Sequence, residues 1–182
     1  MRENILFGSE FESRKYAQVV KACQLTHDLS ILPAGDLTEI GEKGINLSGG
    51  QKARLSLARA VYKLPDVLLL DDPISALDAH VRKMIFKKVF QEILKDKTRI
   101  LITHAVDFVH LADRIVIMDE GKIDAVGTFE ELQEHSYMKQ ILQIHNENKI
   151  SVEEAADLDE MISSGNSDKE NNENQDNLEA EM

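Results

Sequence analysis

The feature that most constrains the fold is a short apolar run, Val67–Leu70, which ends in two acids, Asp71 and Asp72. Four consecutive apolar residues suit a strand that is buried on both faces, as strands of parallel sheets are. A second strand-like segment, Arg99–Thr103, ends at His104. Because a helical pattern separates the two segments, they can lie side by side in parallel. We therefore predict an α/β domain with a partly parallel sheet.

The segment before the apolar run is mainly helical in pattern. Residues 1–12 are interpreted as an extended or loop segment, and a helix is predicted over Arg14–Gln24. A shorter helical piece over His27–Leu32 stops at Pro33 because proline ends helices. Residues 34–46 are glycine-containing and predict a loop. The expected buried face of the first helix comprises Tyr16, Val19, Val20 and Cys23.

From Gln51 onward, helical and strand-like patterns alternate. The expected elements are, in chain order, a helix over Gln51–Lys63, the strand Val67–Leu70, a helix over Ala76–Lys95, the strand Arg99–Thr103, a short helix over Val106–Ala112, the strand Arg114–Met118, the strand Ile123–Val126 and a helix over Ser136–His145. Asp119–Lys122 forms the hairpin turn, and Thr128–Glu131 resembles a capping box that opens a further helix. Buried faces are expected at Leu55, Ala58 and Val61 or Tyr62, and at Val81, Ile85, Val89 and Ile93.

The net charge of −12 is concentrated in one part of the sequence. Residues 146–182 hold 12 acids and 2 bases, a net charge of −10, which leaves −2 for residues 1–145. A nearly neutral body without a basic stripe argues against nucleic acid as a partner. Residues 163–177 contain no apolar side chain, so we expect a disordered acidic tail over 146–182.

Cysteine content and hydropathy limit the environment of the chain. Cys23 is the sole cysteine, so an internal disulfide is impossible and a reducing compartment is the natural interpretation. No apolar run approaches the roughly 20 residues that a membrane-spanning helix needs. We expect any membrane association to come through a partner or through chain outside this sequence.

A candidate anion site lies at Leu47-Ser48-Gly49-Gly50-Gln51. Glycines remove side chains where a backbone comes close to another group, and the start of a helix offers free N–H groups and a positive dipole end. Phosphate suits such a site. Ser48 either bonds the phosphate or caps the helix, and the sequence leaves both interpretations open.

The acids after the apolar run form a second candidate site. Asp71 stands at the carboxyl end of a predicted buried strand, where α/β folds bind ligands and where Mg²⁺ combines a few carboxylates with phosphate oxygens. Alternatively, Asp71 and Asp72 belong to an ordinary turn, and His104 has a structural role. The order and spacing of all three segments favour a functional interpretation.

Together, these segments resemble the second half of an ABC-transporter ATP-binding domain. Leu47–Gln51 matches the signature motif, Val67–Asp71 the Walker B strand, Ser75–Asp78 the D-loop and His104 the switch histidine. The resemblance extends from residue 2 to about residue 145. It therefore implies an ABC ATPase fold of the P-loop NTPase class, with a helical signature subdomain.

Further segments narrow the resemblance to one branch of the family. Arg2–Gly8 is similar to the segment after the Q-loop, and Thr38–Gly44 is similar to the exporter-type loop that touches the coupling helices of the membrane domains. Leu70–Pro73 and Asp78–Val81 resemble the first ATP-binding domain of the C subfamily, the multidrug-resistance-associated proteins.

The resemblance implies ATP and Mg²⁺ as cofactors and gives each motif a role. Asp71 would hold Mg²⁺, Asp72 would be the water-site carboxylate, and His104 would contact the γ-phosphate. The remaining residues would act across a head-to-tail dimer with a second ATP-binding domain: Ser48, Gly49, Gly50 and Gln51 on its ATP, and Asp78 at the interface. The transmembrane domains would bind through their coupling helices.

Two departures from the family pattern qualify these roles. The family has Glu where this chain has Asp72, so we expect weak or no hydrolysis at its own site. The sequence has no Gly-x-x-x-x-Gly-Lys-Ser/Thr, so we expect a partial fold that lacks the Walker A strand, and no activity from this chain alone.

Val67–Asp71 and Arg99–Thr103 should pair in parallel, whereas Arg114–Met118 should keep only its hairpin partner, beside an apolar gap. We expect the chain to be a fragment.

The resulting organisation is a partial ATP-binding domain over residues 1–145, with a helical subdomain over about 10–63 and a core over about 64–145, followed by the tail 146–182. The expected function is ATP-driven export of organic anions or drugs, at the cytoplasmic face of a membrane. Two alternatives are a soluble ABC ATPase that is not a transporter and a non-catalytic dimerisation or regulatory module.

Overall fold

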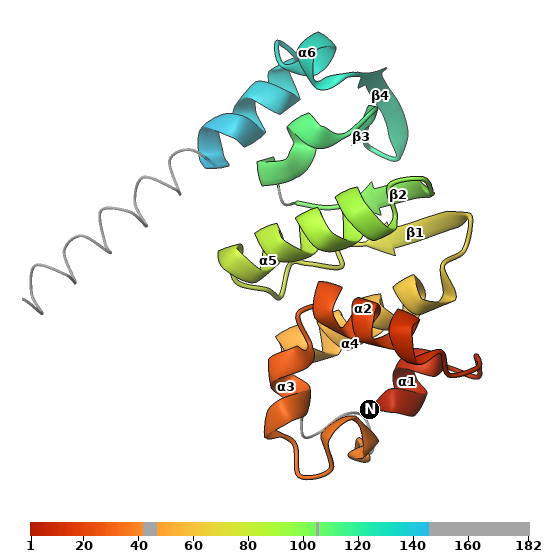
Figure 1. Ribbon diagram of the computed structural model, residues 1–182. Helices are drawn as coiled ribbons and strands as arrows, with labels where there is room; N and C mark the ends of the chain where they lie inside the picture. Colours follow the sequence, from red (N-terminus) through yellow and green to blue (C-terminus); the bar gives the residue numbers. More distant parts are fainter. Residues whose placement is uncertain (42–46, 105, 146–182) are drawn as a thin grey trace, which may run out of the picture. The chain divides into compact units, whose positions relative to one another are not determined.

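The computed structural model describes residues 1–41, 47–104 and 106–145, and these residues mix helices and strands as expected (Figure 1). Two compact units are present: the first covers Met1–Phe108, and the second begins at Val109. The acidic tail and the last part of the Thr38–Gly44 loop lie outside the described residues, and the domain bounds predicted from the sequence stay predictions.

The first unit begins with a helix where a loop was predicted. α1 (Arg2–Leu6) buries Ile5 and Leu6 and contacts α4 (Gly49–Lys63). The expectation of an extended segment over residues 1–12 is therefore wrong for its first half. Tertiary packing determines the helical conformation of this short segment. A five-residue helix has little stability by itself, but here it buries an apolar face against α4.

Two further helices follow α1, as the periodicity predicted. α2 (Ser13–Ala22) and α3 (Thr26–Ile31) lie within two residues of the expected bounds, and the 3₁₀ turn η1 (Gly35–Leu37) follows. Figure 1 shows α1 and α2 beside α4. The predicted apolar faces are confirmed, because the following side chains are buried: Tyr16, Val19, Val20, Cys23, Leu55, Ala58, Val61 and Tyr62.

The predicted parallel pair of strands is confirmed. β1 (Val67–Asp71) and β2 (Thr98–Ile102) pair in parallel, with Val67 opposite Thr98 and Asp71 opposite Ile102. The expectation that β1 is buried on both faces is wrong. Leu68 and Leu70 are buried, whereas Leu69 is 75% exposed, because the described residues cover only one face of this two-stranded sheet.

The helix between the two strands starts later than predicted. α5 begins at Ala79 rather than Ala76, because the Asp78 carboxylate caps it by accepting a hydrogen bond from the Val81 N–H (2.9 Å). α5 (Ala79–Ile85) continues as the π-helical segment η3 (Phe86–Ile93). Ile85 and Val89 are buried, as expected, and join Leu68 and Leu70 in one core.

The second unit is a small hairpin with short helices. The 3₁₀ segment η4 (Val106–Leu111) leads to β3 (Ile115–Asp119), which pairs antiparallel with β4 (Lys122–Gly127). In the part of the chain that the structure describes, β4 is the strand that pairs with β3. The expected apolar gap beside it stays a prediction.

The capping box after the hairpin is also confirmed. The Thr128 side chain accepts from the Glu131 N–H (3.3 Å), and the Glu131 carboxylate accepts from the Thr128 N–H (2.8 Å), which opens α6 (Phe129–Leu132). A last described helix covers residues 136–145. Ile117, Leu132 and Met138 form the buried core of this unit.

Candidate functional site

Ser48 caps α4, so the capping interpretation is what the structure shows. Its hydroxyl accepts from the Gln51 N–H (3.2 Å), and its own N–H donates to Gln51 Oε1 (2.9 Å). This is a reciprocal capping box. Capping does not exclude phosphate binding, because a hydroxyl that accepts one bond still has a proton to donate. Ser48 is exposed, so a ligand can reach that proton.

The two glycines of the motif have different surroundings. A Cβ placed on Gly49 would meet nothing within 4 Å, so the space before the helix is open there. A Cβ on Gly50 would lie 3.3 Å from the Ala76 carbonyl oxygen and 3.4 Å from Leu77 Cδ2. Gly50 thus permits close packing against the Ser75–Asp78 turn, whereas only Gly49 leaves room for a ligand.

A half-buried polar cluster supports the start of α4. Gln51 Nε2 donates to Asp28 Oδ1 (2.8 Å), and Arg54 forms an ion pair with Asp28 Oδ2 (2.9 Å). Asp28, in α3, is only 6% exposed. This cluster was not predicted from the sequence. The available signal was the spacing of Gln51 and Arg54, which puts both on one side of a helix.

Asp71, Asp72 and His104 lie at one end of the parallel sheet. Asp71 ends β1 opposite Ile102, and the Asp72 N–H donates to the Ile102 carbonyl (2.8 Å). His104 follows β2 and is exposed. The structure therefore brings these three residues to the carboxyl edge of the sheet, where α/β folds bind ligands.

Asp72 has an unusual backbone and an unusual environment. Its φ angle is +44°, in the left-handed region that few residues other than glycine adopt. Its Oδ1 atom is buried and accepts no hydrogen bond from the described residues. Ser75 Oγ donates to the Asp72 carbonyl (3.1 Å), which holds the turn after β1. A buried acceptor without a donor costs free energy, so this oxygen is suited to an incoming donor or cation.

These carboxylates fit a magnesium ion that arrives with phosphate. The described residues contain no group of three or more His, Cys, Asp or Glu side chains able to hold a metal ion alone. Mg²⁺ in phosphate sites is usually bound by one or two carboxylates together with substrate oxygens. The exposed Asp71 carboxylate and the free Asp72 Oδ1 supply that set.

Asp78 has a structural partner in this chain. Its hydrogen bond from the Val81 N–H lowers the pKa of the Asp78 carboxyl, so the cap stays ionised well into acid. Asp78 is exposed, and the turn that precedes it contacts Gly50. The motifs around Gly50 and Asp78 are thus neighbours, as a shared interface would require.

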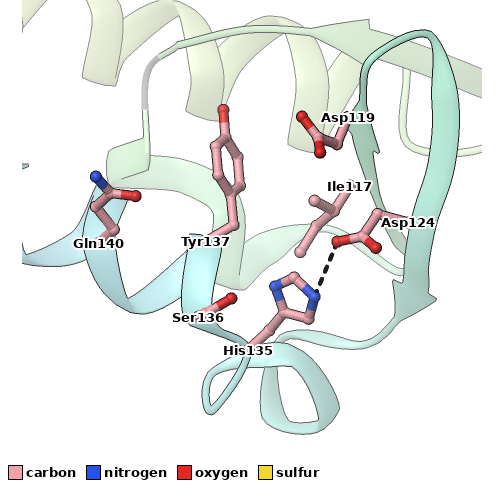
Figure 2. Close-up of a pocket in the computed structure, with 7 residues that line it drawn as sticks. All are labelled: Ile117, Asp119, Asp124, His135, Ser136, Tyr137 and Gln140. Carbon is pink, nitrogen blue, oxygen red and sulfur yellow. Dashed lines mark ion pairs between the residues drawn. The ribbon is translucent and has the colours of Figure 1, made fainter.

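The second unit contains a hollow that no predicted site residue lines. It is lined by Ile117, Asp119, Asp124, His135, Ser136, Tyr137 and Gln140. Figure 2 shows the Asp124 carboxylate beside the His135 ring, and His135 Nε2 lies 3.1 Å from Asp124 Oδ2. This contact connects the segment before helix 136–145 to β4 and indicates a structural role.

Comparison with known proteins identifies clear similarities. The profile of the ABC transporter family matches residues 1–75. The chain is 60% identical over 134 residues to "Multidrug resistance protein mrp-7" of Caenorhabditis elegans, which covers 72% of this chain and 9% of that protein. It is 52% identical over 143 residues to "ABC-type transporter cicA" of Emericella nidulans, covering 78% of this chain and 10% of that protein.

A plant transporter shows a similar level of identity to this chain. "ABC transporter C family member 9" of Arabidopsis thaliana is 51% identical over 148 residues, which is 81% of this chain and 10% of the relative. The chain thus spans about a tenth of the length of the relatives it matches. None of the described helices has the length and apolar content that crossing a bilayer requires.

Proposed function

We propose that this chain is part of the ATP-binding domain of an exporter. The reason is that it has the ATP-binding-domain sequence of ABC transporters and resembles the C-family members of that family. ABC transporter domains bind ATP, generally with Mg²⁺, and generally pair with a second such domain and with transmembrane domains. The exporter would couple ATP binding and hydrolysis to the movement of organic anions or drugs across a membrane, from its cytoplasmic face.

The observation that supports this proposal best is the open, exposed start of α4. Ser48 and Gly49 are exposed, and a Cβ on Gly49 would meet no atom within 4 Å other than those of its chain neighbours and of its own helix backbone. The Gly49 and Gly50 N–H groups have no carbonyl partner within the helix, so these two groups and the Ser48 hydroxyl proton can donate to one anion. An exposed donor set of this kind suits the γ-phosphate of ATP that a second domain holds.

In this arrangement, Gln51 acts mainly by holding Ser48. Its side-chain oxygen accepts from the Ser48 N–H, and its backbone N–H donates to the Ser48 hydroxyl. That hydroxyl accepts one bond and still has its proton to donate to a ligand. Gly50 keeps α4 close to the D-loop turn, and Asp78 at the end of that turn would face the partner domain.

The carboxyl edge of the β1–β2 sheet would be this chain's own nucleotide site. Bound ATP with Mg²⁺ would supply the phosphoryl group and neutralise its charge. Asp71 would hold the cation, Asp72 would accept a hydrogen bond from water, and the exposed His104 would contact the γ-phosphate. The short, partly buried Asp72 side chain reaches less far than a glutamate, so we propose that this site holds ATP with little turnover.

The test is a substitution at Ser48 in the native gene product, assembled in membrane vesicles. Ser48→Arg would remove the hydroxyl donor and place a long side chain over the start of α4, so ATPase activity should fall by about 10²-fold or more. Ser56→Arg is a matched control, because Ser56 is an exposed serine on the same helix. Undiminished ATPase in Ser48→Arg, at normal protein levels, would refute the proposed role of α4.

A further inference from the structure

We propose that Asp28 and Arg54 are positioning residues that fix the orientation of the signature serine, Ser48, through the Gln51 side chain. The inference rests on the proposed function, because it assigns these residues to the same donor set at the start of α4. Neither side chain is expected to touch ATP. Each acts through a chain of hydrogen bonds that ends at the Ser48 N–H and hydroxyl.

The hydrogen bonds form a continuous path from α3 to Ser48. Arg54 Nη2 donates to Asp28 Oδ1 (3.2 Å), and Gln51 Nε2 donates to the same oxygen (2.8 Å). Gln51 Oε1 then accepts from the Ser48 N–H (2.9 Å). No donor–acceptor distance in this path exceeds 3.2 Å, so a displacement of the Asp28 carboxylate would move the Gln51 side chain and with it Ser48.

The charge of Asp28 determines which way the Gln51 amide faces. An ionised carboxylate only accepts hydrogen bonds, so it must face the NH₂ group of the amide. The amide oxygen is then directed to the Ser48 N–H. With the amide reversed, a donor would face the Ser48 N–H and the capping box would be lost. Asp28 therefore determines the geometry of Ser48 without contacting it.

Arg54 holds the carboxylate in place and also binds the motif itself. Its Nη1 pairs with Asp28 Oδ2 (2.9 Å) and donates to the Gln24 carbonyl. Its Nε donates to the Gly50 carbonyl (3.3 Å). The Arg54 side chain is 16% exposed and that of Asp28 is 9% exposed. At this burial, removing either partner leaves the other charged group poorly solvated, so the two stay paired.

The first experiment compares two arginines of α4. Arg54→Gln should lower the maximal ATPase rate of the native gene product in vesicles by about tenfold, as loss of a supporting residue commonly does. Arg59 is the matched control, because it also lies on α4 and donates to a main-chain carbonyl, that of Asn4 (2.9 Å). Arg59→Gln should keep the rate per folded molecule within about twofold. Equal rates for the two variants would overturn the inference.

The second experiment tests the amide orientation by rescue. Gln51→Glu puts a second carboxylate against Asp28, so the two should repel and the rate should fall by about tenfold. Adding Asp28→Asn supplies an NH₂ group to the new glutamate, whose oxygen can again accept from the Ser48 N–H. The double variant should recover at least half of the wild-type rate. No recovery, with normal protein levels, would refute the orienting step even if Arg54→Gln failed to fold.

The Ser48→Arg variant separates the two proposals. Retained activity in Ser48→Arg would refute the proposed function, and the inference with it. Loss of activity in Ser48→Arg together with wild-type activity in Arg54→Gln would refute the inference alone. Loss in both, with rescue in the double variant, is the result that we expect.

Discussion

Alanine at Gly49 and at Gly50 should have opposite effects on stability. The two residues are adjacent in α4, and each variant adds one methyl group. At Gly49 that methyl group meets nothing within 4 Å, whereas at Gly50 it lies 3.3 Å from the Ala76 carbonyl oxygen. The pair therefore separates helix propensity from packing.

The expected magnitudes follow from these contacts. Alanine is favoured over glycine in a helix by roughly 0.5–1 kcal/mol, so Gly49→Ala should be stabilising by up to that amount. Gly50→Ala has the same gain, but crowding in a packed site costs about 1–3 kcal/mol. Leu77, the other neighbour of that methyl group, is 8% exposed and cannot move freely. Gly50→Ala should therefore be less stable than Gly49→Ala by about 1–3 kcal/mol.

Urea unfolding of the chain measures stability, and ATPase activity of the native gene product measures function. Gly49→Ala should lose about 10²-fold in activity although it is more stable, because its methyl group occupies ligand space. A Gly49→Ala variant with wild-type activity would show that no ligand uses this space. A Gly50→Ala variant as stable as Gly49→Ala would show that the D-loop turn yields to the methyl group.

Three other predictions concern stability and reactivity. Hydrogen bonds from Arg2 lower the pKa of the Asp36 carboxyl in the folded state. The pair therefore stabilises the fold fully above about pH 3.9, the pKa of Asp in the unfolded chain, and the stabilisation is lost as the pH falls through the lower pKa of the folded state. Asp36→Asn should weaken the dependence of the free energy of unfolding on pH in the acid range. Burial raises the pKa of the Cys23 thiol to about 12, so labelling by a disulfide reagent at neutral pH should wait for unfolding, and labelling as fast as a free thiol would contradict this. Leu70→Ala should cost about 2–5 kcal/mol in urea unfolding, whereas Leu69→Ala, at a position 75% exposed, should cost less than about 1 kcal/mol; equal costs would be inconsistent with the one-sided sheet.

Helical periodicity and strand order were readable from the sequence. The buried positions of α2 and α4 follow the expected spacing of three and four, because each helix packs one face into the core. The parallel pairing of β1 and β2 was predictable because a helix connects them. The capping box at Thr128 was predicted, whereas at Ser48 capping was one of two open interpretations.

The predictions that were wrong concern segments whose structure depends on contacts with residues far away in the sequence. α1 is stabilised by packing against α4, which a window of residues 1–12 does not contain. The apolar run of β1 suggested two buried faces, but composition cannot state which elements cover each face. Asp28 had no predicted role, and only the fold places it against Gln51 and Arg54.

The roles of individual site residues depend on neighbours that sequence spacing does not give. Gly49 and Gly50 were equivalent in the motif, yet one is open and the other packs against Ala76. Asp72 was recognised as a shortened glutamate, but its positive φ and its buried Oδ1 depend on the turn after β1. These residues show that the local environment of a candidate site residue depends on the fold.

A phenol links the far end of α4 to the segment before α2. The Tyr62 hydroxyl accepts from the Glu12 N–H (2.9 Å) and donates to the Glu10 carbonyl (2.7 Å), so it binds both sides of the segment before α2. α4 has 15 residues and is about 22 Å long. A nearly rigid rod of that length moves at both ends when one end is displaced. Hydrogen exchange at the Glu12 amide should therefore report, from the opposite end of the helix, any event that shifts Ser48.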